Sequence, residues 1–207
     1  GWVAGPRMWS SGADVGPTGG HTDWGHGYAY DVSRPSFTAG VADGADGVLE
    51  LVRHQHRLGA KVVKIMPSGG VVSAGDDPRA KLMTDAEIAA AVDAAHALGM
   101  PIAAHAHGKE AIDAAVRLGV DSIEHGTYAD AESFALMAAN GTYFVPTLLM
   151  THRLHETATR HPEALNPSTV QKVLAMGTGD EKLTNAYRAG VPIVLGSDTG
   201  SGQNMGE

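Results

Sequence analysis

Residues 99–126, GMPIAAHAHGKEAIDAAVRLGVDSIEHG, contain two consecutive copies of one pattern. In each copy a glycine precedes a short apolar run, and a histidine stands six residues after the glycine: His105 follows Gly99, and His125 follows Gly119. Glycine suits the left-handed position that ends a helix, and a short apolar run suits a strand buried on both faces. Residues 109–118, between the copies, have the apolar spacing of an amphipathic helix. The stretch therefore predicts a helix–strand unit that repeats along the chain.

The same pattern recurs elsewhere in the sequence. After further glycines, Lys64 lies in the run KVVKIM, Thr147 ends the run TYFVPT, and Asp198 closes VPIVLGSD. Strands that alternate with helices predict a parallel sheet with right-handed crossovers, and a barrel built this way brings the carboxyl ends of its strands to one rim. We therefore expect Lys64, His105, His125 and Asp198 to meet at that rim.

The predicted fold is α/β, a (β/α)8 TIM-barrel type that is incomplete, with one partial barrel domain over residues 1–207. A barrel of eight units needs about 250 residues, whereas this chain has 207. The strand candidates are near Gly5–Ser11, Lys61–Met66, Ile102–His105, Ser122–His125, Tyr143–Thr147 and Ile193–Gly196. We expect about strands 3 to 8 to be present, with the first two strands and the C-terminal region missing.

Composition excludes several classes of partner. The formal net charge of −8 argues against nucleic acid and anionic membranes. The sequence has no apolar run long enough to span a bilayer and no signal-peptide pattern. The absence of cysteine excludes disulfides and thiolate metal sites. We expect a cytoplasmic protein, unless an N-terminal signal has been lost, and leave a homo-oligomer open.

A glycine-rich segment over residues 12–47 has no helical period. Long segments of this kind inside a domain are usually functional or disordered. Because it carries His21, Tyr28 and Arg34, we expect a loop over the active-site rim in which one of these side chains binds substrate. The alternative is a loop that packs through its aromatic residues.

The strand-end side chains favour metal chemistry. Imidazole suits zinc and related divalent ions, which predicts His105 and His125 as metal ligands. A lysine that points into a barrel is costly to bury as an ammonium. Lys64 either extends to the rim or pairs with Asp198 as a cation, or it is a carbamate that bridges two metal ions. Asp198 can bind a metal and also accept the proton of a metal-activated water as general base.

Two residues beside these ligands are further candidates. His107 would share the direction of His105 if the strand continued, but Gly108 favours a loop position, so we expect a substrate contact, with metal ligation as the alternative. Tyr128, in EHGTY, is placed to donate a hydrogen bond to a developing oxyanion; its alternative role is loop packing.

The motifs VVKIMPSGG, AAHAHG, SIEHGT and LGSDTG resemble, in order, the fourth, fifth, sixth and eighth strand ligands of the amidohydrolase superfamily. The stretches TGGHTD, KIMPSGGV, HAHG and IEHGTY are similar to its prolidase-like and imidazolonepropionase-related branch, which hydrolyses dipeptides and N-acyl amino acids. The resemblance covers essentially the whole chain.

This resemblance implies a role for each ligand. Lys64 would be the carboxylated bridging lysine, His105 and His125 would ligate one metal, and Asp198 would ligate the other and act as base. The complete enzyme would hold two zinc ions. The HxH pair on the first strand of the family is not in these residues. We therefore expect only part of a binuclear site here, and no turnover by this chain alone.

The predicted function is a metal-dependent amidohydrolase that cleaves the amide bond of a dipeptide or N-acyl amino acid, as an Xaa-Pro dipeptidase does. One alternative is a deaminase or cyclic-amide hydrolase of the same superfamily. Another is a barrel enzyme that forms a Schiff base through Lys64. The third is a degenerate barrel without activity.

Overall fold

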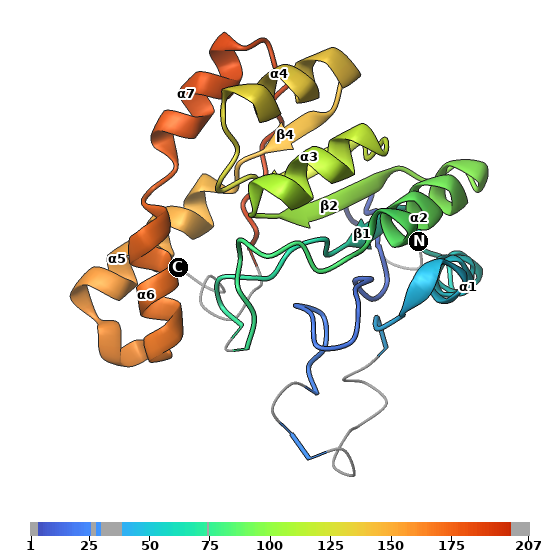
Figure 1. Cartoon of the computed structure of the whole chain (residues 1–207), viewed down its shortest axis with the longest axis horizontal. Helices are drawn as coiled ribbons and strands as arrows, with labels where there is room; N and C mark the ends of the chain where they lie inside the picture. The colour runs from blue at the N-terminus through green and yellow to red at the C-terminus, as the bar shows by residue number, and fades with distance from the viewer. Residues whose placement is uncertain (1–3, 26–27, 30–38, 74, 200–207) are drawn as a thin grey trace.

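The computed structural model of the chain describes residues 4–25, 28–29, 39–73 and 75–199. Within them, helices and strands alternate over residues 44–145, and helical elements then follow one another over residues 148–188 (Figure 1). The elements in chain order are α1 (Gly44–Arg57), β1 (Val63–Ile65), α2 (Asp85–Ala97), β2 (Ile102–Ala106), α3 (Lys109–Arg117), β3 (Ser122–His125), α4 (Ala131–Asn140), β4 (Tyr143–Val145), α5 (Leu148–Arg160), the 3-10 helix η2 (Pro162–Ala164), α6 (Pro167–Met176) and α7 (Asp180–Arg188).

The strands form one sheet in the order β1-β2-β3-β4, and every neighbouring pair is parallel. A parallel bridge from Val15 to Ile65 continues this order beside β1, and another from Ile193 to Phe144 continues it beside β4. Six segments in chain order thus lie side by side. The predicted α/β class with parallel strands is confirmed, and the arrangement is consistent with an incomplete TIM barrel.

The expected strand near Gly5–Ser11 is wrong in position. The segment beside β1 is centred on Val15, whose N–H donates to the Lys64 carbonyl and whose carbonyl accepts from the Met66 N–H, both at 2.8 Å. Met8 and Trp9 suggested a buried strand, but both side chains are exposed. Apolar residue type alone misplaced the strand.

Helix ends follow local sequence signals closely. The Thr84 hydroxyl accepts from the Glu87 N–H and the Glu87 carboxylate accepts from the Thr84 N–H, which makes a capping box at the start of α2. Asp130 caps α4 through the Ser133 N–H, and that helix ends at Gly141 with a φ of 69°. Such caps need only neighbouring residues, so the sequence predicts them well.

Most of residues 150–166 belongs to helix α5, although their composition is polar and includes several histidines. Met150, Leu154 and Ala158 recur every four residues and are buried. They pack with Val71 and Val173 in a small hydrophobic cluster, separate from the main core, that joins α5 and α6 to the loop after β1. In Figure 1 these two helices lie at one end of the molecule, far from α1 and α2.

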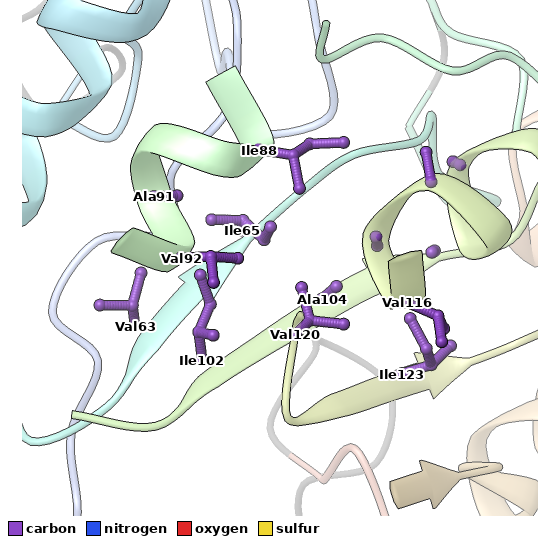
Figure 2. Packing of buried hydrophobic residues seen from close by; sticks show 14 of the residues in the cluster. Val63, Ile65, Ile88, Ala91, Val92, Ile102, Ala104, Val116, Val120 and Ile123 are labelled. Carbon is purple, nitrogen blue, oxygen red and sulfur yellow. The ribbon is translucent and has the colours of Figure 1, made fainter. Parts of the chain in front are cut away.

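The main core lies between the helices and one face of the sheet. Figure 2 shows α2 over β1 and β2, with Ile88 and Val92 facing Ile65 and Ile102. Because side chains alternate along a strand, burial of Val63 and Ile65 against the helices turns Lys64 to the opposite face. None of the described helices has the length and apolar character needed to cross a membrane.

Candidate active site

The inner face of the sheet borders a cavity of about 530 Å³. Its ionisable lining side chains come from almost every segment of the sheet: Asp14, His21, Lys64, His105, His107, Glu124, His125 and Asp198. The four side chains that we expected to meet at the strand ends therefore line one cavity. Their chemical roles stay predictions.

Strand geometry explains two of the histidines. In β2, Ala104 and Ala106 are fully buried toward the helices, so His105 and the following His107 share the cavity side. His107 lies one residue beyond the strand and still lines the cavity. The glycine that follows it does not turn it away from His105.

His125 reaches the cavity by a different route. In β3, Ile123 is buried among core residues, and strict alternation would send His125 to the same side. The φ of His125 is 71°, in the left-handed region, so the alternation breaks and Glu124 and His125 both line the cavity. Among the described residues, Thr147 and Asp198 are the other non-glycine residues with positive φ. Each such residue costs about 1–3 kcal/mol and is typical of functional sites.

His105, His107 and His125, here called the imidazole cluster, offer ligand atoms that all lie within 4.8 Å of one another. Burial, followed by the charges of neighbouring histidines, holds the pKa of His105 and that of His125 well below the usual value. Burial also lowers the pKa of His107, to about 3. The three rings are therefore neutral at pH 7, and neutral imidazole is the form that binds a metal ion.

Two threonines orient this cluster. The Thr127 Oγ1 lies 2.6 Å from the His107 Nδ1, and the Thr147 Oγ1 lies 2.8 Å from the His125 Nδ1. When the hydroxyl oxygen accepts the Nδ1 hydrogen, Nε2 is left with its lone pair toward other partners. The donor type, the neutral charge and these hydroxyl partners together fit a divalent metal ion.

Lys64 lies among carboxylates in the same cavity. Burial lowers its pKa, while the charges of Glu124, Asp14 and Asp198 act in the opposite direction. Burial raises the pKa of Asp14 and that of Asp198, and the Lys64 charge partly offsets both. The Lys64 amine is thus easier to deprotonate than usual, and the neutral amine is the form that reacts with carbon dioxide.

Sequence reasoning missed Asp14 and Glu124 as cavity residues. Glu124 could have been found, because it directly precedes His125 and alternates with the buried Ile123. Asp14 had no such signal, since the strand around Val15 is too short to show a period.

His21 forms part of the cavity wall, as its expected role in substrate binding requires. Its ring stacks on that of His105 with centroids 4.5 Å apart and an angle of 19° between the planes. Its Nδ1 lies 2.9 Å from the Ser73 Oγ. A Cβ on Gly70 would come within 2.1 Å of this ring, so only glycine lets the backbone approach it.

The structure does not bring Tyr28 and Tyr128 into this group. Tyr28 is 59% exposed and lies outside the cavity lining. Arg34 lies outside the described residues. Tyr128 lines a second cavity of about 440 Å³, where the Arg79 guanidinium lies 4.8 Å from the centre of its ring. The roles of all three stay predictions.

Comparison with known proteins places the chain in a family. The model of the amidohydrolase family matches residues 4–207. The ochratoxinase of Aspergillus niger is 35% identical over 98% of this chain and 44% of its own length.

Solved structures agree with this result. A Xaa-Pro dipeptidase with bound methionine in its active site has a TM-score of 0.90 and 36% identity, over 99% of this chain and 50% of that one. A prolidase in complex with N-methylphosphonate-L-proline has a TM-score of 0.85 and 37% identity, over 96% of this chain and 50% of that one. The chain therefore spans about half the length of these relatives.

Proposed function

The chain belongs to the amidohydrolase family, and from this premise we propose that the complete protein is a metal-dependent hydrolase of the amide bond in a dipeptide or N-acyl amino acid. One observation carries the proposal: a neutral imidazole cluster shares a cavity with Lys64 and Asp198. The printed names of two similar structures, Xaa-Pro dipeptidase and prolidase, support a peptide-like substrate.

In this proposal His105 and His125 would hold one divalent ion, Asp198 would hold a second, and carboxylated Lys64 would serve as the ligand shared by both. The short distances within the imidazole cluster allow His107 to be a further ligand or a substrate contact. Zinc is the proposed metal, with two ions in the complete protein. A bound divalent ion would supply Lewis-acid activation of water and of the substrate carbonyl.

Asp198 is the proposed general base and acid. A carboxylate accepts a proton from the attacking water and can then donate it to the nitrogen of the leaving amine. Burial raises the pKa of Asp198, which favours this return of the proton. His21 contacts the substrate from the wall beside His105. Residues Tyr28 and Arg34 are proposed to approach it from the glycine-rich segment.

Tyr128 is the proposed donor to the oxyanion. Its ring packs on Arg79 in the second cavity, so this role requires a substrate, or a movement of the ring, that joins the two cavities. The cytoplasmic location and the lack of nucleic-acid or membrane partners likewise remain part of the proposal, and a homo-oligomer stays open.

The test uses the full-length protein and an Xaa-Pro dipeptide as substrate. Exhaustive chelation is expected to abolish hydrolysis, and added zinc is expected to restore it. His125→Ala should lose both bound metal and activity, whereas His56→Ala, the same change at an exposed position on α1, should lose neither. Hydrolysis that survives chelation would refute the proposal. Borohydride trapping of substrate on Lys64 would instead support the Schiff-base alternative.

A further inference from the structure

Lys172 of α6 makes contacts far from its own helix. Its side chain is only 15% exposed. The amine donates to the Gly70 carbonyl at 3.0 Å and to the Ser73 carbonyl at 2.6 Å, and it lies 3.6 Å from the Asp76 carboxylate. A lysine amine has three hydrogens, and all three of these partners belong to the described residues 67–73 and 75–80 between β1 and α2, here called the 67–80 loop.

That loop also holds His21. The Asp76 carboxylate, whose side chain is 4% exposed, accepts from the Gly70 N–H at 2.8 Å and from the Ser73 hydroxyl. It lies 3.6 Å from the His21 Nδ1, and the Ser73 Oγ lies 2.9 Å from the same nitrogen. One continuous set of contacts therefore runs from the Lys172 amine to the imidazole that stacks on His105.

The buried Asp76 carboxylate depends on the donors and the cation around it. Burial raises the pKa of Asp76, but contacts with His21, Ser73 and the Gly70 N–H outweigh it, so that the pKa lies below the usual value and the group stays ionised. A buried carboxylate requires compensating donors and charge. Lys172 is the nearest fixed cation to Asp76 among the described residues. Its loss would leave both the carboxylate and two backbone carbonyls with fewer partners.

We propose that Lys172 is a positioning residue for the active site: it fastens the 67–80 loop to α6, and the loop in turn holds the His21 ring against His105. Lys172 does not line the main cavity itself and acts through Ser73 and Asp76. The hairpin of α5 and α6 is thereby coupled to the cavity wall. Only the kinetic consequence of this inference rests on the proposed function, through the contact of His21 with substrate.

The first experiment measures hydrogen exchange of the 67–80 loop in the full-length protein. Lys172→Met keeps the aliphatic stem and removes the amine, and Lys172→Arg keeps a cation. Lys61→Met makes the same change at an exposed lysine outside the loop. We expect Lys172→Met to speed exchange of the Gly70 amide by roughly 10- to 100-fold, the factor for loss of hydrogen bonds to charged groups. The arginine variant should keep most of the protection, and Lys61→Met all of it.

The second experiment asks whether Lys172 acts through His21. We expect Lys172→Met and His21→Ala to lower kcat/KM by similar factors, and the double variant to be no worse than His21→Ala alone. Residues that act through one another are non-additive, whereas independent structural damage adds. If Lys172→Met does not fold, Ser73→Ala interrupts the same contacts one step later and is expected to show the same non-additivity with His21.

Three results would overturn the proposal: unchanged loop exchange in Lys172→Met, equal loss of protection in the methionine and arginine variants, or additive losses of kcat/KM. A wild-type protein without amide hydrolysis would refute the proposed function instead. The exchange measurement would still decide whether Lys172 fastens the loop, because it needs no substrate.

Discussion

Thr147→Val tests whether a single hydroxyl controls the metal affinity of this site. Thr147 directly precedes α5, has a φ of 47° and is 3% exposed. Its Oγ1 lies 2.8 Å from the His125 Nδ1. Valine keeps the branched shape at this position and removes only the hydrogen-bonding group. The change therefore leaves His125 in place but without the partner that selects its tautomer.

The size of the effect follows from this geometry. Without an acceptor, the part-buried Nδ1–H of His125 loses its partner, or the proton moves to Nε2 and occupies the lone pair that a metal needs. Loss of such an outer partner typically lowers metal affinity about 10- to 100-fold, which is about 1.4–2.7 kcal/mol. Stability without metal should change by about 1 kcal/mol or less if the proton moves.

The assay is zinc affinity of the full-length protein, measured by competition with a chromogenic chelator. Thr142→Val is the matched control: Thr142 is 2% exposed, and its hydroxyl donates to the Val120 carbonyl at 3.2 Å, at the opposite end of β4. It should lower stability by about 1 kcal/mol and leave zinc affinity unchanged. Zinc affinity of Thr147→Val within twofold of the wild type, or an equal loss in the control, would refute the reasoning.

Three further predictions concern charge and backbone. Without metal, the free energy of unfolding should fall as the pH drops below about 6.5, because the unfolded chain binds protons that the folded imidazole cluster excludes. The loss should reach up to roughly 1.4 kcal/mol per pH unit for each histidine of the cluster, and for His107 it continues to the folded pKa of about 3. A free energy of unfolding that does not change between pH 6.5 and 5 would contradict this prediction. Gly126→Ala should destabilise the protein by about 3 kcal/mol in urea unfolding, because the φ of Gly126 is +55° and a Cβ would come within 2.5 Å of the buried Phe144 ring. Gly141→Ala is the control: its φ is +69° but the space around it is open, so the change should cost only about 1 kcal/mol. Lys64→Ala should release about one metal equivalent per full-length chain, measured by elemental analysis; unchanged metal content would favour the mononuclear deaminase alternative.

The sequence predicts the elements well where neighbouring residues carry the signal. The capping box at Thr84, the cap at Asp130 and the end of α4 before Gly141 each depend on residues a few positions apart. The expectation that Lys64 and His105 share one face also follows from alternation in buried parallel strands, and both line the main cavity. The strand predicted near Gly5–Ser11 is misplaced, because that prediction rested on apolar residue types and not on a repeating pattern.

The site was less accessible to such reasoning. His107 lies one residue beyond β2, as the expected loop position requires, but its closeness to His105 and His125 was not expected. Tyr128 lines the second cavity against Arg79, and its role as donor to an oxyanion stays a prediction. A histidine two residues past a ligand and a tyrosine three residues past another have no local pattern that sets their direction. Backbone angles beyond the strand ends set it.

Local periodicity and capping determine that this chain forms parallel strands alternating with helices, and parallel strands oblige Lys64 and His105 to share a cavity. Only the tertiary structure decides in which direction the side chains beyond the strand ends point. His125 enters the cavity because tertiary contacts hold it at a φ of 71° against the alternation of its strand. Lys172 and Gly70 are joined across 102 positions of the chain. Contacts at that distance depend on how the whole domain packs, and no short stretch of residues encodes them.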